Sequence, residues 1–430
     1  SQAFMGMLSD NSTLRWGRRR PFLVISTLLN SVFVVAIAFS SGMSGMSGFW
    51  FLFIIGILLQ ISSNIGQAAE QAFIPDVVPM GKRGKFSGVK ALLELPLPMA
   101  LAFLSGQFLV KKGMIREALY LAIGVFVIST LVAMLVPEKR NLVKQKLNWQ
   151  PFLRLLAMTV VFTAVILSMG EGVKLLSGFT ASLESFGAQF IMMGLAGLAG
   201  MLVAVGLGVW VSVRISIGGG EARKNPSFTW WVINRLAFLV GATNLSTFTV
   251  YFMQARLGYE GAEAAGPGTF LLLFVAGFIM ISTIPSGALA DRFGRKRLVA
   301  LSGVLASIGT LIAISVPSLP VIYTGGSIIG IATGLFFTAN WALGTEIVPK
   351  QEAARYLGIS NLAGAGAGAV GAYIGGPIAD HFTRNFPDMQ GIGYVLLFGI
   401  YGTMFLLSIL PLLRVRETRE VEAVPVVQSV

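Results

Sequence analysis

The sequence predicts an all-α protein that crosses a lipid bilayer many times. Three features lead to this prediction: 55% of the 430 residues are hydrophobic, only 12% are charged, and long apolar runs recur along the chain. A soluble domain carries about 25% charged residues. A helix of about 20 apolar residues spans the hydrocarbon core of a bilayer. The composition therefore favours a polytopic membrane protein over a soluble domain.

Twelve apolar segments have the length of a spanning helix, which would return the C-terminal tail to the side on which the first span begins. The predicted spans are Phe22–Ser40, Phe49–Ala69, Ser87–Val110, Ala118–Val136, Phe152–Gly170, Gly187–Val213, Trp231–Met253, Phe270–Ala290, Leu298–Val316, Val321–Ala342, Leu357–Ala379 and Tyr394–Leu413.

Positive charge is unevenly divided between the two sides of this topology. The formal net charge is +13. One side holds 26 of the 32 Lys and Arg residues, all except Lys111, Lys112, Arg116, Lys174, Arg256 and Arg384. Cytoplasmic loops carry such an excess, so we expect the basic loops and the C-terminus in the cytoplasm, and no binding of nucleic acid.

A short charged motif occurs twice between apolar runs. Its residues are Gly6, Asp10, Gly17 and Arg18 in the first copy and Gly287, Asp291, Gly294 and Arg295 in the second. In each half an acidic residue, Asp76 or Glu346, follows the second predicted span after the motif. These two positions lie 270 residues apart, as do Gly88 and Gly358. The constant offset indicates an internal repeat, which is typical of transporter folds.

This duplicated Gly-x-x-x-Asp…Gly-Arg turn resembles the loop signature of the major facilitator superfamily. The resemblance implies a fold of two pseudo-symmetric helix bundles that expose a central cavity alternately to each side. Residues 1–136 would supply the third to sixth helices of the first bundle, with the first two helices lying before Ser1. Residues 137–230 would form a linker with an extra transmembrane hairpin, residues 231–413 the second six-helix bundle, and residues 414–430 a cytoplasmic tail.

The resemblance also assigns a gating role to the motif. Asp10 would cap the helix that begins near Leu357, and Asp291 the helix that begins near Ser87, since a carboxylate stabilises the positive end of a helix. Arg18 would join Asp76, and Arg295 would join Glu346. These contacts would close the cytoplasmic side. The alternative is that all are ordinary solvated charges at the membrane surface.

Polar residues inside the spans are candidates for binding substrate or the coupling proton, because charges are costly there. Glu94 could carry a proton or bind a substrate hydroxyl, or could form a structural pair with Lys90 four residues earlier. The other candidates are Glu70, Asn64, Gln67, Asn244, Asn340, Trp341 and Asn361. Amides beside aromatic rings suit neutral polyols, but the same residues often join helices.

Other polar and small residues are expected to have structural roles. We expect Asn234 and Arg235 to anchor the start of a helix at the interface, and Asp380 and His381 to be solvated at an outer helix end. Three charged residues, Glu171, Lys174 and Glu184, are expected in the outer loop of the hairpin. Glycines at 364, 368, 371 and 375 predict close helix approach, either as fixed packing or as a sliding surface.

The spacing from Asp10 to Gly17 and the Arg-Arg-Arg-Pro-Phe ending resemble sucrose–proton symporters and their glycoside–pentoside–hexuronide relatives. This implies a monomeric proton-coupled sugar or glycoside symporter in a bacterial inner membrane. One alternative is an exporter of amphipathic compounds, which a cavity lined by Met and Phe would favour. The other is a non-transporting pigment-assembly or scaffold protein, which a collapsed cavity would favour. With no Cys, one His and no nucleotide-binding motif, we expect no enzyme activity, no cofactor and no metal.

Overall fold

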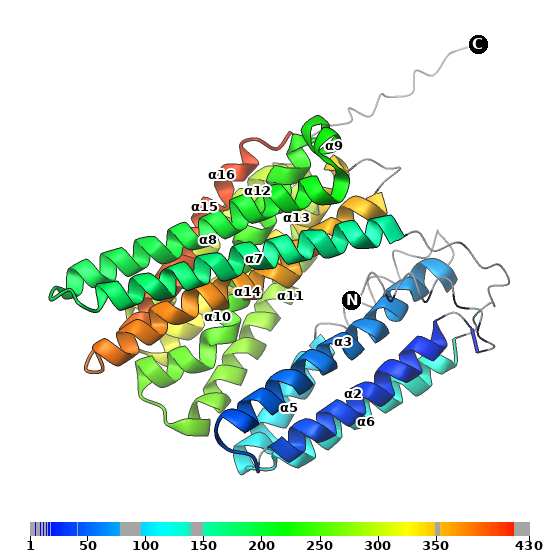
Figure 1. The fold of residues 1–430 in the computed structure, drawn as a ribbon, viewed down its shortest axis with the longest axis horizontal. Coiled ribbons are helices and arrows are strands. Elements are labelled where there is room, and N and C mark those ends of the chain that lie inside the picture. Colours follow the sequence, from blue (N-terminus) through cyan, green and yellow to red (C-terminus); the bar gives the residue numbers. More distant parts are fainter. Residues whose placement is uncertain are drawn as a thin grey trace. The chain divides into compact units, whose positions relative to one another are not determined.

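Long helices make up the described part of the chain in this computed structural model (Figure 1). The structure describes residues 19–40, 42–77, 96–136, 138, 149–348 and 353–416 and, before residue 19, only Met5, Ser9, Ser12, Leu14, Trp16 and Gly17. Within these residues, eleven helices are long and apolar enough to cross a membrane. This confirms the predicted all-α polytopic architecture. The predicted span Ser87–Val110 is described only over Pro96–Phe108 and its C-terminal end.

The chain divides into two compact units, Ser1–Leu153 and Arg154–Val430. The helices of the first unit are α2 (Arg20–Ser40), α3 (Gly45–Val77), α5 (Pro96–Phe108), the short η2 (Val110–Lys112) and α6 (Ile115–Met134). Helix α2 packs against both α3 and α6. Hydroxyl groups join these helices: Ser26 Oγ donates to the Ser62 carbonyl at 2.8 Å, and Thr27 bonds to Thr130. Polar contacts of this kind hold helices together in lipid, where apolar burial does not.

The second unit contains the hairpin and six further spans. Its helices are α7 (Trp149–Thr180), α8 (Phe186–Ile217), α9 (Gly219–Lys224), α10 (Pro226–Leu257), η3 (Gly261–Ala264), α11 (Ala265–Phe293), α12 (Arg295–Ser315), α13 (Leu319–Ile347), α14 (Ala353–Asn385), α15 (Ile392–Leu407) and α16 (Ile409–Leu412). Several helices extend past the predicted spans. Helix α7 continues to Thr180 instead of ending at Gly170, and α10 starts at Pro226 instead of Trp231.

Helix α10 is the central element of the second unit. In its most apolar 18-residue window 61% of the residues are buried, against 22% for α7. Phe238 of α10 stacks on Phe336 of α13, with ring centroids 3.7 Å apart, and lies against Phe405 of α15 at 4.9 Å. These contacts fix α10 between two neighbours, so polar groups on its inner face are held in a rigid setting.

The hairpin of α7 and α8 belongs to this second unit. Helix α8 packs against α10, α14 and α15, and Figure 1 shows α7 alongside α8. Gly208 of α8 leaves room for the Phe162 ring of α7, because an added Cβ would lie 2.8 Å from that ring. The hairpin is therefore packed on the C-terminal helices and is not a detached linker.

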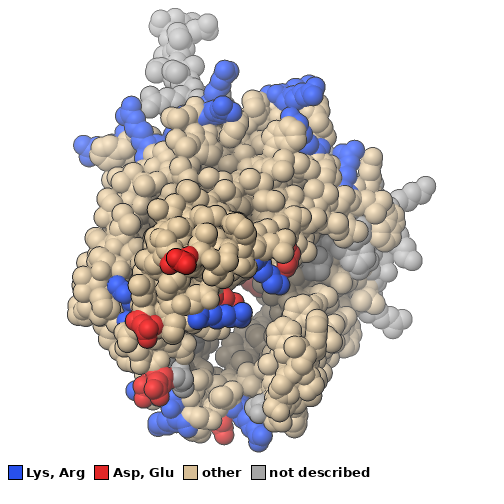
Figure 2. Space-filling view, turned by 60° about the vertical axis from the view of Figure 1, so that its left-hand side comes forward, with Lys and Arg blue, Asp and Glu red and all other residues tan. Residues whose placement is uncertain are grey.

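Apolar side chains cover the outward faces of the helices, as expected in lipid. Ile284 of α11 is 84% exposed and Leu175 of α7 is 76% exposed. Figure 2 shows Lys and Arg side chains gathered along the upper edge of the face in view, with a broad uncharged area below them. The charges thus lie at helix ends and leave the middle of the helices apolar.

Glycines permit close contact at several helix crossings. In the predicted glycine row of α14, an added Cβ would meet Asn244 Nδ2 at 2.0 Å from Gly371 and Leu397 Cδ1 at 2.5 Å from Gly375, whereas Gly364 faces open space. Backbone meets backbone where α12 crosses α13, because a Cβ on Gly325 would lie 2.4 Å from the Gly309 carbonyl oxygen. The row is therefore close-packed only over part of its length.

We predict that Gly325→Ala lowers the thermal unfolding midpoint of the detergent-solubilised protein. The methyl group would force α12 and α13 apart, and such overpacking costs about 1–3 kcal/mol. Gly277→Ala is the matched control, because nothing lies within 4 Å of its added Cβ and alanine favours a helix. Intrinsic tryptophan fluorescence would report both midpoints. Equal midpoints for the two variants would contradict the close contact.

Candidate functional site

The second motif copy forms an ion-pair cluster at the turn between α11 and α12. Gly294 lies between the two helices. Its φ of +92° is a backbone conformation that favours glycine. Arg295 Nη1 lies 2.7 Å from Glu346 Oε2 on α13, and Arg295 Nη2 lies 3.9 Å from Asp291 Oδ1. The structure thus brings Arg295 and Glu346 together, as the family resemblance implied, while Asp291 is a looser partner.

Burial distinguishes the members of this cluster. The Glu346 side chain is 18% exposed and Arg295 is 35% exposed, whereas Asp291 is 76% exposed. An exposed ion pair contributes about 0–1 kcal/mol, and partial burial with a short charge-assisted hydrogen bond strengthens it. The Arg295–Glu346 pair is therefore the strongest contact of the cluster. The expected partner of Asp291, the helix start near Ser87, lies outside the described residues.

The first motif copy is described only in part. Gly6, Asp10 and Arg18 lie outside the described residues, as does the side chain of Asp76, whose backbone is in α3. The expected contacts of Asp10 with the helix start near Leu357, and of Arg18 with Asp76, are therefore not visible. Gly17 has φ +106°, the same left-handed turn that Gly294 makes in the second copy.

Glu138 caps α2 beside this first copy. Its carboxylate accepts from the backbone N–H of Arg19 at 2.6 Å and of Arg20 at 3.3 Å. A carboxylate at a helix N-terminus is favourable because it pairs with free N–H groups and with the helix dipole. A Cβ on Gly17 would meet the Glu138 carboxylate, so the glycine leaves room for the cap. Sequence reasoning missed Glu138, whose only signal is an acid isolated among basic residues.

Both copies also tie a basic side chain to the end of the last helix in their own half. Arg20 Nη2 donates to the Val136 carbonyl, just past α6, and Lys296 Nζ donates to the Val415 carbonyl at 3.0 Å, just past α16. Basic side chains stabilise the unpaired carbonyls at a helix C-terminus. The motif therefore anchors the end of each half, a role that the sequence did not predict.

A buried polar network connects α10 with α13 and the turn between α15 and α16. Arg235 Nη1 donates to Asn340 Oδ1 at 3.0 Å, and Asn340 Nδ2 donates to Asn234 Oδ1 at 2.8 Å. Asn234 Nδ2 then donates to the Ser408 carbonyl at 2.7 Å. Asn234 is 0% exposed and Arg235 is 9% exposed. The expectation that they anchor the helix at the interface is wrong, because α10 begins earlier, at Pro226, and carries both residues into the core.

Two tryptophans flank this network. Trp231 Nε1 donates to the Asn340 carbonyl at 3.0 Å. The Arg235 guanidinium carbon lies 5.9 Å from the Trp231 ring and 5.4 Å from the Trp341 ring. Trp341 is 42% exposed, so the network reaches the surface of the unit at this ring. Two of the substrate candidates, Asn340 and Trp341, thus lie on either side of an arginine.

Asn244, a further candidate in the second unit, lies outside this network. Asn244 Nδ2 donates to the Val240 carbonyl at 2.8 Å and to the Ala367 carbonyl at 2.9 Å, so Asn244 joins α10 to α14. The first unit holds Glu70 and Gln67, which are exposed, and Asn64, which is half-buried, all on α3. Glu94, Lys90 and the side chain of Asn361 lie outside the described residues.

His381 fastens the hairpin to α14. Its ring is 3% exposed, so the expectation of a solvated histidine is wrong. Nδ1 lies 2.9 Å from Ser177 Oγ on α7, and Nε2 lies 2.8 Å from Gln189 Oε1 on α8. Gln189 donates its amide to the Leu183 carbonyl at 2.6 Å. Its oxygen therefore accepts from His381 Nε2, which assigns a proton to Nε2.

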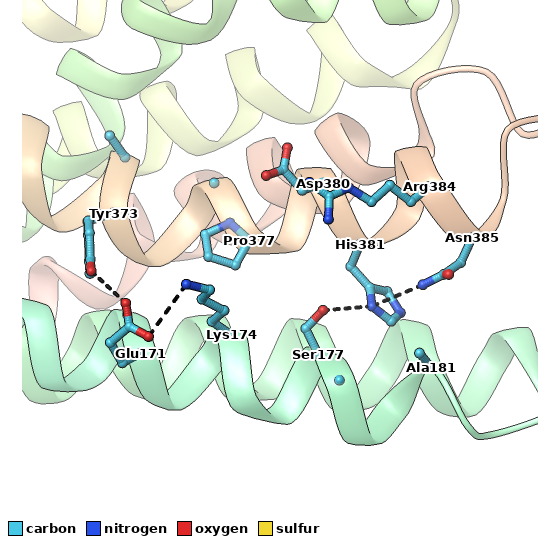
Figure 3. A pocket seen from close by; sticks show the side chains of 14 residues that line it. Glu171, Lys174, Ser177, Ala181, Tyr373, Pro377, Asp380, His381, Arg384 and Asn385 are labelled. Atoms are coloured by element: carbon cyan, nitrogen blue, oxygen red, sulfur yellow. Dashed lines mark hydrogen bonds and ion pairs between the residues drawn. The ribbon is translucent and has the colours of Figure 1, made fainter. Parts of the chain in front are cut away.

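A cavity of about 490 Å³ lies between α7 and α14 beside this histidine (Figure 3). Tyr373 donates to Glu171 Oε1 at 2.7 Å, and Lys174 Nζ lies 3.7 Å from Glu171 Oε2. Glu171 and Lys174 are on helix α7 and not in the outer loop, because α7 is longer than its apolar run. Glu184 does lie in the loop and is exposed.

The sequence of the whole chain decides the family. The sequence model of the Major Facilitator Superfamily matches residues 1–219 and 236–428. The chain belongs to the Major Facilitator Superfamily. The fold of this chain is similar to one solved structure with a TM-score of 0.51. That structure is a bacterial homologue of the human lysosomal transporter Spinster in an inward-facing and occupied conformation. It is 16% identical and the match covers 96% of this chain and 83% of that chain, a likeness of fold.

Curated relatives match over shorter stretches. The minor myo-inositol transporter IolF of Bacillus subtilis (strain 168) is 29% identical over 136 residues, which are 31% of this chain and 29% of IolF. An uncharacterised MFS-type transporter, Rv1877 of Mycobacterium tuberculosis, is 28% identical over 280 residues, 64% of this chain and 38% of that protein. The sucrose transport protein SUC3 of Arabidopsis thaliana is 29% identical over 107 residues, 21% of this chain and 18% of SUC3. The chain thus spans well under half of each relative.

Three polar clusters are therefore set into one half of a superfamily fold. The Arg295–Glu346 pair lies at the start of α12 and the end of α13, and the Arg235–Asn340 network lies within α10 and α13. His381 lies near the C-terminal end of α14. The first is an ion pair, and the other two are hydrogen-bond networks with aromatic neighbours. Such groups can bind a solute or hold two helices together.

We predict that Gln189→Leu lowers the thermal unfolding midpoint, because it leaves the buried Nε2–H of His381 without an acceptor. An unsatisfied buried donor costs about 1–3 kcal/mol. Ser177→Ala should have a smaller effect, since the Asn385 amide also lies 3.3 Å from His381 Nδ1. Ser182→Ala is the control, because Ser182 is exposed and bonds only locally, to the Phe179 carbonyl. An unchanged midpoint for Gln189→Leu would show that His381 does not fasten the hairpin.

Proposed function

We propose that the chain belongs to a secondary active transporter that takes up a sugar or glycoside together with protons by alternating access. The observation that carries this proposal is the Arg295–Glu346 ion pair, 2.7 Å long, in the second of two copies of the charged motif. Family membership supports transport in general terms. The motif copies support a mechanism with two states, because each copy sits at a helix turn on the side of the membrane that is rich in basic residues.

The ion pair would act as a latch of limited strength. Its members are 18% and 35% exposed, so solvent screening keeps its contribution at about 1 kcal/mol. A contact of this size changes the ratio of two states about fivefold. It can therefore bias the transporter toward the state in which the inner side is closed without locking it there, provided that the opposite state breaks the contact.

Two named relatives support the choice of a sugar or polyol. IolF is a myo-inositol transporter and SUC3 is a sucrose transport protein. Amide and aromatic side chains at Asn340 and Trp341 suit hydroxylated solutes, which need hydrogen bonds in two directions and a face for stacking. Glu94 remains the proposed proton carrier, with Lys90 as its neighbour. We place the protein in the bacterial inner membrane, with the motif loops and the C-terminus in the cytoplasm, on the distribution of Lys and Arg.

An uptake panel tests this function. The full-length protein in proteoliposomes would be given labelled sucrose, maltose, myo-inositol and D-glucuronate with and without an inward proton gradient. We expect at least one solute to accumulate only with the gradient, and Glu94→Gln to abolish that dependence. Accumulation without any effect of the gradient would contradict proton coupling, and no accumulation of any of these solutes would contradict sugar transport.

We predict that Glu346→Gln slows gradient-driven uptake about threefold to tenfold, since it removes a contact worth roughly 1 kcal/mol in one state only. The charge-swapped double variant Arg295→Glu with Glu346→Arg should regain part of the rate. The control is Glu221→Gln, which breaks the exposed 2.8 Å pair with Lys224 on α9. Initial uptake rates that are equal for Glu346→Gln and Glu221→Gln would rule out the latch.

A further inference from the structure

Arg235 is a buried cation within a membrane-spanning helix. Its side chain is 9% exposed and it lies well inside α10, whose apolar window is the most buried of the described spans. A charge within a membrane segment costs about 2.5–3.5 kcal/mol even on the lenient insertion scale, and such residues are rarely retained without a role. A buried guanidinium is normally paired with a carboxylate.

The described residues provide no such partner. Within them, no carboxylate oxygen lies within 4.0 Å of the guanidinium, and Glu346, on the same helix as Asn340, is already paired with Arg295. Only Nη1 has a hydrogen-bond acceptor, the amide oxygen of Asn340. Arg235 Nε is buried and has no acceptor. The edge formed by Nε and Nη2 is therefore left without the acceptor that a guanidinium requires.

The two halves differ at the position that contacts Arg235. Asn340 lies 270 residues after Glu70, the same offset that relates Asp76 to Glu346. The first half thus has a carboxylate at the position where the second half has an amide. An amide accepts one hydrogen bond from Arg235 but does not neutralise it.

The surroundings hold the guanidinium in place. The Asn340 amide is oriented by its bond to Asn234, and Asn234 by its bond to the Ser408 carbonyl. Trp231 and Trp341 lie on the guanidinium at 5.9 Å and 5.4 Å. A neutral glutamine could donate to Asn340 equally well, so packing alone does not account for a charge at this position.

We propose that Arg235 binds an anionic group, most suitably a carboxylate, on the transported solute. Movement of the side chains that cover Nε would let a carboxylate accept two parallel hydrogen bonds from Nε and Nη2, the pairing for which the planar guanidinium fork is best suited. The half-exposed Trp341 ring marks the side from which the solute reaches the site and offers it a stacking face. This inference rests on the proposed transport function and narrows its solute to sugars or glycosides that carry a carboxylate.

Binding of matched solute pairs tests the inference. The pairs are D-glucuronate with D-glucose, D-galacturonate with D-galactose, and benzoate with benzyl alcohol, each measured by calorimetry on the purified full-length protein. We expect at least one carboxylate to bind about tenfold or more tighter than its neutral counterpart. Arg235→Gln should reduce that preference to less than about twofold, and Arg235→Lys should give an intermediate value because lysine keeps the charge but not the fork.

Two further variants separate binding from folding. Arg214→Gln is the control, because Arg214 also stacks on a tryptophan, Trp210 at 3.3 Å, but at the end of α8; its preference should equal that of the wild type. Asn340→Asp would provide Arg235 with an internal carboxylate, so this variant should elute as a folded monodisperse protein and still lose the preference. A purely structural Arg235 would leave the preference of Asn340→Asp unchanged.

The inference is overturned if no carboxylate in the panel binds, if the neutral solutes bind as tightly, or if the preference survives Arg235→Gln. These outcomes differ from a failure of the proposed function. Gradient-driven uptake of a neutral sugar by both wild type and Arg235→Gln would leave transport standing and refute the anion site. If a carboxylate binds to the wild type and not to Arg235→Gln, but no solute is taken up, the anion site stands and the transport function is refuted.

Discussion

The hydrocarbon core of a membrane offers no hydrogen bonds, and this constraint organises the whole molecule. Every backbone group within it must be paired inside a helix, and charges are driven to the helix ends. Working contacts between charges are therefore confined to the rims of the bundle, where Arg295 meets Glu346 at 2.7 Å. Such a contact can be made and broken at low cost because water reaches it. Arg235 departs from this pattern, and the departure makes it a candidate for binding.

The two halves use the charged motif in parallel ways. In each, a glycine with positive φ precedes one helix, and a basic residue shortly after it holds a carbonyl beyond the last helix of that half. The halves differ in their acidic partners: Glu138 caps α2, whereas Glu346 pairs with an arginine side chain. The motif thus combines a structural anchor, common to both halves, with a side-chain ion pair seen in the second. The hairpin adds a further fixed element, because His381 bonds to both of its helices.

Much of the fold could be predicted because hydropathy and the 270-residue repeat are properties of sequence alone. The resemblance of the motif to the superfamily signature also implied Glu346 as the partner of Arg295. The burial of single residues was harder to predict from the sequence. The apolar run begins at Trp231, but α10 starts at Pro226, which places Arg235 in the core. His381 was misjudged because its partners, Ser177 and Gln189, are about 200 residues distant in sequence, at separations of 204 and 192. Glu138 was missed for the same reason, since it caps a helix that begins 118 residues earlier.

A distance measurement across the inner rim tests most directly whether the Arg295–Glu346 pair controls two states. The chain has no cysteine, so spin labels can be introduced as Leu14→Cys and Arg223→Cys, at exposed positions in the two units, without removing native thiols. We expect pulsed electron resonance on the full-length protein to show two distance populations, with Glu346→Gln enriching the longer one several-fold. A single population that Glu346→Gln leaves unchanged would contradict a latch at this rim.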